Sequence, residues 1–69
     1  MPLTMVEAGK ATSIKKVGGR EETRQFLTKL GFIPGTYVTV VTKLHGNVIV
    51  SIKESRVAIS KEMASRIMV

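Results

Sequence analysis

The side chains that could support catalysis or metal binding are few and scattered in this 69-residue chain. His45 is the only histidine and cysteine is absent. The acidic residues are Glu7, Glu21, Glu22, Glu54 and Glu62, and they show no metal-ligand spacing. A transition-metal site normally needs several His, Cys or carboxylate ligands, and a lone histidine beside a Gly-Asn turn is typical of a solvated loop. We therefore predict neither a metal site nor a bound cofactor.

Two other kinds of catalytic chemistry also lack necessary groups. Nucleophilic catalysis needs a base and an orienting group beside the nucleophile, and the sequence pairs none of its serines with such groups. Gly18-Gly19 precedes a predicted helix, but the longer glycine pattern of a phosphate-binding loop and its following Lys-Ser or Lys-Thr are absent. The sequence predicts a protein that is not an enzyme.

The chain is basic, with 11 lysine and arginine residues against five acids and a formal net charge of +6. This balance favours nucleic acid, an anionic membrane surface or an acidic protein surface as partner, although an ordinary hydrated surface explains it equally well. Single-stranded nucleic acids usually stack on exposed aromatic side chains. Only Phe26, Phe32 and Tyr37 are aromatic, and we expect two of them in the core. We therefore predict no specific nucleic-acid binding.

Length and hydropathy limit the domain organisation and the location of the chain. We predict one domain, residues 1–69, near the size at which a single core only just offsets chain entropy. No segment approaches the roughly 18 apolar residues of a membrane span, and the start lacks a secretion-signal pattern. This predicts a cytoplasmic protein without membrane insertion. The methionines, Met1, Met5, Met63 and Met68, are interpreted as gap-filling core residues.

The segment Leu30-Gly31-Phe32-Ile33-Pro34-Gly35 predicts the junction between a helix and a sheet. Gly31 suits the left-handed residue that closes a helix, and Pro34 presets φ for a turn. Gly35 can adopt the positive φ that other residues resist. An amphipathic helix is predicted before the junction, over residues 20–30, and short strands after it.

The remaining pattern predicts a mainly β protein. Strands are expected over residues 10–17, 37–43, 47–52 and 56–59, with a fifth at 67–69. Val48, Val50 and Ile52 alternate with Asn47, Ile49, Ser51 and Lys53 and should face the core. Ser60 suits the N-cap of a short helical turn. Five short strands favour closure into a partly open barrel, because closure hides strand edges. Exposed edges and Ile49 are compatible with weak self-association.

Three segments together resemble the FeoA family of small cytosolic accessory proteins of ferrous iron uptake. They are an opening (Pro2-Leu3-Thr4, Val6, Gly9, Ala11, Ile14, Val17, Gly18-Gly19), a middle (Arg24, Leu27, Leu30-Gly31-Phe32, Pro34-Gly35, Tyr37-Val38-Thr39-Val40) and a close (Val57-Ala58-Ile59, Ala64, Ile67, Val69). The resemblance implies an SH3-like barrel with one helix inserted after the first strand and a short helical turn before the last. Lys53-Glu54-Ser55 departs from it, because a glycine-containing turn is common at this position in the family.

The resemblance also implies a partner, the cytoplasmic GTPase region of the membrane ferrous iron transporter FeoB. The leading hypothesis is therefore a non-enzymatic accessory protein that acts by contact with FeoB. The residues predicted to make this contact are five basic side chains on and before the helix and two apolar ones at the junction: Lys15, Lys16, Arg20, Arg24, Lys29, Phe32 and Ile33.

The alternative hypothesis is a small basic DNA-binding regulator of the swapped-hairpin type, whose chains also carry an LGxxPG helix exit before a strand. The segment from Arg56 to Val69 counts against it, because such regulators lack the extra strand and helical turn. The scattered positive charge and the absence of an IPKE-like lead into the helix also count against it.

Overall fold

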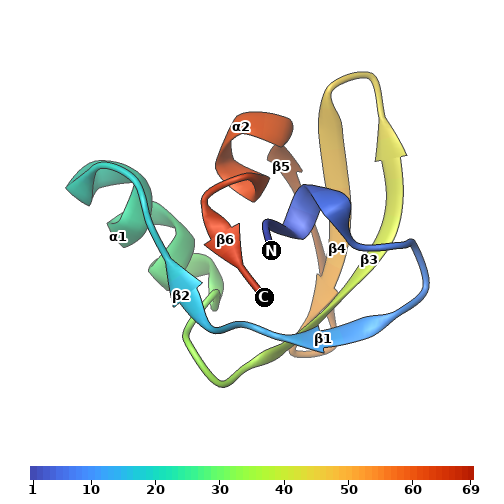
Figure 1. Ribbon diagram of the computed structural model, residues 1–69, viewed down its shortest axis with the longest axis horizontal. Helices are drawn as coiled ribbons and strands as arrows, with labels where there is room; N and C mark the ends of the chain where they lie inside the picture. The colour runs from blue at the N-terminus through green and yellow to red at the C-terminus, as the bar shows by residue number, and fades with distance from the viewer.

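Two antiparallel sheets form the frame of the computed structural model, which describes residues 1–69 (Figure 1). The larger sheet has the strand order β1-β3-β4-β5, and the smaller sheet pairs β2 with β6. The elements are η1 (Leu3–Met5), β1 (Ala11–Ser13), β2 (Lys16–Val17), α1 (Glu21–Leu30), β3 (Tyr37–Leu44), β4 (Asn47–Ile52), β5 (Ser55–Ser60), α2 (Lys61–Ala64) and β6 (Ile67–Met68). The predicted mainly β fold and its element order are confirmed, and the sheets do not close into a barrel.

The prediction of one strand over residues 10–17 is wrong in one respect. This segment forms two strands, β1 and β2, which belong to different sheets. The backbone N–H of Ile14 donates to the Thr36 oxygen at 2.9 Å, beside β3 of the larger sheet. The next N–H, that of Lys15, donates to the Met68 oxygen at 2.8 Å, in β6 of the smaller sheet. The chain therefore changes hydrogen-bonding partner between these two residues.

The junction after α1 has the conformation that the sequence predicts. Gly31 is left-handed, with φ of +106°, and its N–H donates to the Thr28 oxygen. The N–H of Phe32 donates to the Leu27 oxygen at 3.0 Å. These two bonds satisfy carbonyl groups that the end of a helix would otherwise leave free. Their pattern is the Schellman motif.

A tight turn follows and leads into β3. The N–H of Thr36 donates to the Ile33 oxygen at 3.0 Å, with Pro34 and Gly35 between them and Gly35 at φ +92°. Proline at the second position and a positive φ at the third define a type II turn. The N–H of Gly35 also donates to the Ile14 oxygen at 2.7 Å, which holds the turn against the link between β1 and β2.

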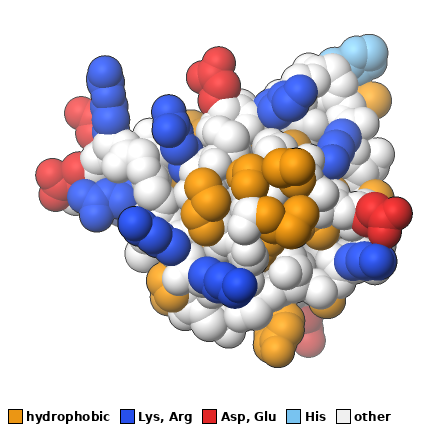
Figure 2. Space-filling model, viewed as in Figure 1, with side chains coloured by type: hydrophobic (Ala, Val, Ile, Leu, Met, Phe, Trp, Pro, Cys, Tyr) orange, Lys and Arg blue, Asp and Glu red, His pale blue; other side chains and the backbone are white.

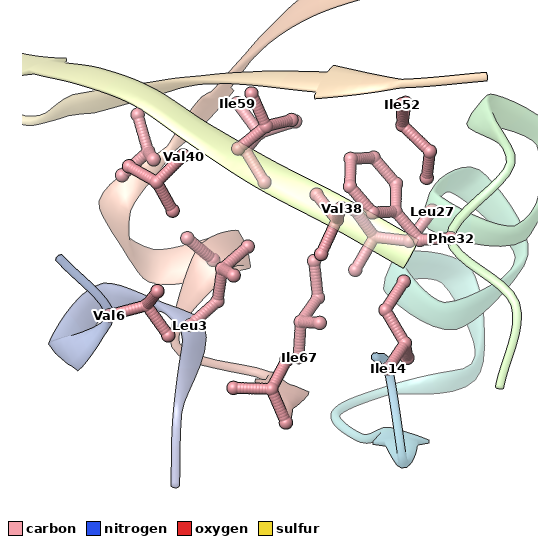
Figure 3. Close-up of a cluster of buried hydrophobic side chains, with 14 residues drawn as sticks. Leu3, Val6, Ile14, Leu27, Phe32, Val38, Val40, Ile52, Ile59 and Ile67 are labelled. Atoms are coloured by element: carbon pink, nitrogen blue, oxygen red, sulfur yellow. The ribbon is translucent and has the colours of Figure 1, made fainter. Parts of the chain in front are cut away.

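The core lies between the two sheets and α1, and it contains fourteen buried apolar side chains (Figure 3). They are Leu3, Val6, Ile14, Leu27, Phe32, Val38, Val40, Val48, Val50, Ile52, Ile59, Ala64, Ile67 and Val69. The predicted alternation along β4 is confirmed, because Val48, Val50 and Ile52 are all buried.

The prediction that two of the three aromatic side chains are in the core is wrong. Phe32 is fully buried, whereas Phe26 is 47% exposed and Tyr37 is 69% exposed. Phe26 precedes Leu27 on α1, and a short helix on the edge of a small domain buries only a narrow stripe. Leu27 occupies that stripe.

The two ends of the chain lie side by side at the centre of the view in Figure 1. Pro2 pairs with Met68 in an isolated antiparallel bridge, and the Val69 N–H donates to the Met1 oxygen at 2.8 Å. This pairing extends the small sheet across the first residues. No helix in the structure has the length and apolar character needed to cross a bilayer.

The fold also bears on the swapped-hairpin alternative. The LGFIPG segment leads into β3, and β3 pairs with β1 and β4 of the same chain. The hairpin is followed by β5, α2 and β6, the extra strand and helical turn that swapped-hairpin regulators lack.

Candidate functional site

Three exposed methionine side chains lie around the place where the chain ends meet, with Met1 and Met5 in one shallow hollow and Met68 across from Pro2. Met1, Met5 and Met68 are 59%, 67% and 36% exposed. We call these three residues the methionine face. The prediction that the methionines fill gaps in the core is wrong for them, and only Met63 is partly buried and packs against the core.

Local structure explains why these side chains point outward. Met68 lies between Ile67 and Val69, which are both buried, so strand alternation turns Met68 to the other side. Met5 ends η1, whose buried residue is Leu3. Alternation around Met68 was a signal in the sequence that could have identified one residue of the face. No local signal places Met1 and Met5 beside it, because the pairing of the chain ends is tertiary.

Lysines adjoin the methionine face. Lys16 is the cross-strand partner of Met68, and Lys15 lies immediately before β2. Lys10 lines the same shallow hollow as Met1 and Met5. Figure 2 shows apolar side chains at the centre of this side of the molecule, with lysine and arginine side chains around them. We call Lys10, Lys15 and Lys16 the basic rim.

One member of the basic rim is paired with an acid. The Lys10 ammonium lies 3.0 Å from the Glu7 carboxylate, and both side chains are more than 70% exposed. Such exposed pairs contribute little to stability and are screened by salt. Lys15 and Lys16 form no ion pair, and Lys16 is the cross-strand partner of Met68.

The basic residues predicted as contacts do not form one patch. Lys15 and Lys16 belong to the basic rim. Arg24 and Lys29 lie on the outer surface of α1, in a shallow hollow that Glu21 also lines. Arg20 is beside α2, where it lines another hollow with Thr23, Ser60, Glu62, Met63 and Arg66. The predicted set is therefore spread over separate parts of the surface.

The two apolar residues predicted as contacts have opposite environments. Phe32 is completely buried among the core side chains, so a partner cannot reach it in the folded protein. Its prediction as a contact is therefore wrong. The physical reason is the helix-ending motif, which directs Phe32 back onto α1. Ile33 is 41% exposed and remains accessible.

The surface is suited to contact with another protein. No polar or charged side chain is buried, and the structure contains no group of three His, Cys, Asp or Glu side chains arranged to hold a metal ion. Methionine is unbranched and polarizable, so its side chain adapts to apolar partners of different shape. An apolar centre with a charged rim is the usual composition of a protein–protein interface. The methionine face and basic rim thus match an apolar partner surface with acidic residues at its border.

The two small antiparallel sheets, with a helix inserted between β2 and β3, define a small SH3-like β domain. A model of the FeoA domain matches residues 1–69, and the chain belongs to the FeoA family. A search of curated proteins finds no match.

Solved structures agree with this assignment. The crystal structure of an iron uptake regulatory protein (FeoA) is 30% identical, covers 99% of this chain and 92% of its own, and has a TM-score of 0.89. FeoA from Stenotrophomonas maltophilia, solved with zinc, is 22% identical, with coverages of 99% and 87% and a TM-score of 0.86. It is described as a prokaryotic SH3 domain protein and as a candidate ferrous iron transport activating factor.

A manganese-dependent transcriptional repressor has the same fold in part of its chain. It is 14% identical, the match covers 97% of this chain and 39% of the repressor, and the TM-score is 0.89. At this identity the likeness concerns the fold alone. The family assignment favours the iron-uptake hypothesis over the DNA-binding alternative.

Proposed function

We propose that this FeoA protein is a non-enzymatic accessory protein of ferrous iron uptake that docks on the cytoplasmic GTPase region of FeoB. The observation that carries the proposal is the exposed methionine face with its basic rim. Membership of the FeoA family supports the connection with iron uptake. The description of one relative as an iron uptake regulatory protein supports an accessory rather than a transporting role.

The methionine face would supply most of the binding energy. Full burial of one methionine side chain is worth about 1.5–3 kcal/mol relative to exposure, and three exposed methionines surround the meeting point of the chain ends. Part of this energy is spent on ordering the side chains and losing rigid-body freedom. The expected interaction is therefore a reversible one, as suits a regulatory contact.

The basic rim would act mainly on the rate and orientation of association. Charges at the border of an interface steer encounter and exclude wrongly charged partners, while they add little to affinity. Lys16 is paired with Met68 and Lys15 precedes it, so these lysines favour a partner whose apolar contact is bordered by Asp or Glu. This complementarity explains why a protein of net charge +6 would select an acidic protein surface.

The proposal is tested with the purified GTPase region of FeoB. Isothermal titration calorimetry at low ionic strength is expected to detect binding, either without nucleotide or with GTP or GDP bound. The rates of GTP hydrolysis and of iron uptake, measured with and without this protein, then give the sign of the effect. Absence of binding in every nucleotide state, together with unchanged iron uptake after deletion of the gene, would contradict the proposal.

A further inference from the structure

A small cavity lies between η1, the tip of the β3–β4 hairpin and the start of α2. Its volume is about 170 Å³. The lining residues are Thr4, Lys43, Leu44, His45, Gly46, Asn47, Val48 and Lys61. None is acidic, and three of them are basic. None belongs to the methionine face or the basic rim, so this is a separate feature.

Two hydrogen bonds hold the walls of the cavity together. The Lys43 ammonium donates to the Thr4 carbonyl oxygen at 2.6 Å, which ties the hairpin to η1. The Lys61 backbone N–H donates to the Gly46 oxygen at 2.8 Å, which ties the start of α2 to the hairpin tip. Val48 is buried beneath. The basic groups are therefore attached to elements that the fold has already fixed relative to one another.

The groups that line the cavity are mostly hydrogen-bond donors. An ammonium group has three N–H donors, so Lys43 keeps two after its bond to Thr4, and the side chain of Lys61 keeps all three. Asn47 adds an amide, and His45 adds a ring N–H. The nearest acid in sequence, Glu62, lines a different hollow together with Lys61. Several donors and no acid in one cavity specify an anionic ligand.

We propose that this cavity binds one free oxyanion of the phosphate type. Its size supports a single small anion, because pockets for larger organic ligands usually measure about 300–1,000 Å³. A tetrahedral oxyanion presents several acceptor oxygens at once, which matches donors that come from three elements. The hydrogen bond to Thr4 orients the Lys43 side chain before the ligand arrives, and this lowers the entropy lost on binding.

The test is an NMR titration of the intact chain with sodium phosphate, with ionic strength held constant by sodium chloride. Saturable shift changes are expected at the backbone amides of Gly46, Asn47 and Lys61. Lys61→Gln should weaken binding about tenfold, because it removes a charged donor. The Lys61 side chain makes no hydrogen bond in the structure, so this variant should fold normally. Lys29→Gln, on the outer surface of α1, is the matched control and should bind phosphate like the original protein.

Three results would overturn the proposal. The first is a set of shift changes that do not saturate or that spread evenly over all lysines, which would indicate general charge screening. The second is unchanged phosphate binding in both Lys61→Gln and Lys43→Gln. The third is an equal response to sodium acetate at the same ionic strength, which would assign the cavity to a carboxylate instead of phosphate.

Discussion

The backbone N–H of Phe32 donates a hydrogen bond to the Leu27 oxygen at 3.0 Å, and both side chains are completely buried (Figure 3). The same pair of residues thus ends α1 and joins it to the core. Gly31 makes this possible, because its left-handed backbone lets the chain reverse within one residue. The orientation of α1, and hence of the surface that it presents, depends on this junction.

Replacement of Gly31 by alanine tests the backbone requirement at the junction. An added Cβ would meet only the flexible side chains of Lys53 and Ile52 at 3.6–3.9 Å, so the cost comes from φ of +106°. We expect Gly31→Ala to lower the free energy of unfolding by about 1–2 kcal/mol, measured by urea denaturation. Gly18→Ala is the matched control, since Gly18 has no positive φ and its added Cβ has an ordinary contact. Equal stability of the two variants would refute the explanation.

Replacement of Phe32 and of Ile33 distinguishes a core residue from a surface residue at neighbouring positions. Phe32→Ala should cost about 3–5 kcal/mol, because it leaves a cavity in the core. Ile33→Ala should change stability by less than about 0.5 kcal/mol, because its side chain is partly in solvent.

Chemical denaturation measures both effects, and Phe32→Leu gives a measurable intermediate if the alanine variant does not fold. Similar losses at the two positions would contradict the environments described here.

The turn between β4 and β5 stores backbone strain that can be removed. Lys53 and Glu54 lie between the paired residues Ile52 and Ser55, with φ of +48° and +65°. Two-residue turns of this kind favour Asn-Gly, because other residues resist positive φ. The change Lys53→Asn with Glu54→Gly should raise the free energy of unfolding by about 1 kcal/mol.

For a chain of this size, such a gain raises the melting temperature by about 4–8 °C. Glu54→Ala is the control, because it removes the side chain without relieving the backbone, and it should bring no gain. A melting temperature that stays the same or falls in the Asn-Gly variant would show that the turn is not strained.

The cap of α2 gives a further prediction. The Ser60 hydroxyl accepts a hydrogen bond from the Met63 backbone N–H at 3.1 Å, as the sequence predicts for an N-cap. Ser60→Ala should lower the free energy of unfolding by about 1 kcal/mol. Ser60→Asp should keep most of the stability, because aspartate is also a good N-cap residue. Ser55→Ala, at an exposed serine without a side-chain hydrogen bond, serves as the control. Thermal unfolding followed by circular dichroism measures these changes. A loss in Ser55→Ala as large as that in Ser60→Ala would contradict the role of the cap.

Residues with local causes were predictable from the sequence. The conformation of Gly31 and Gly35 follows from the residue types in one short segment, and the burial of Val48, Val50 and Ile52 follows from alternation within one strand. The capping role of Ser60 likewise depends on residues three positions apart.

Features that depend on distant segments were not predictable in this way. Lys15 is outside the larger sheet because its N–H donates to the Met68 oxygen, 53 positions along the sequence. No residue near Lys15 in the sequence indicates that partner. The methionine face has the same origin, since Met1 comes near Met68 only because the chain ends pair. Phe26 fits the helical period, yet the domain is too small to cover it.

The basic rim should govern how fast the FeoB GTPase region binds. Lys15→Gln with Lys16→Gln is expected to lower the association rate several-fold at low salt and to reduce its dependence on ionic strength. Arg24→Gln with Lys29→Gln removes the same charge from the outer surface of α1 and should have a smaller effect. Stopped-flow or biolayer interferometry can compare the two pairs. A larger effect of the α1 pair would move the docking surface to that helix.

The most direct test of the central claim is the dissociation constant of the complex with the FeoB GTPase region for the variant Met5→Gln with Met68→Gln. Both side chains are exposed, so the variant should fold normally. If the methionine face is the docking surface, the double variant should bind at least about tenfold more weakly. Tyr37→Gln, at an apolar residue outside the face that is as exposed as Met5, should bind like the original protein. Unchanged affinity of the double variant, or an equal loss in Tyr37→Gln, would contradict the account.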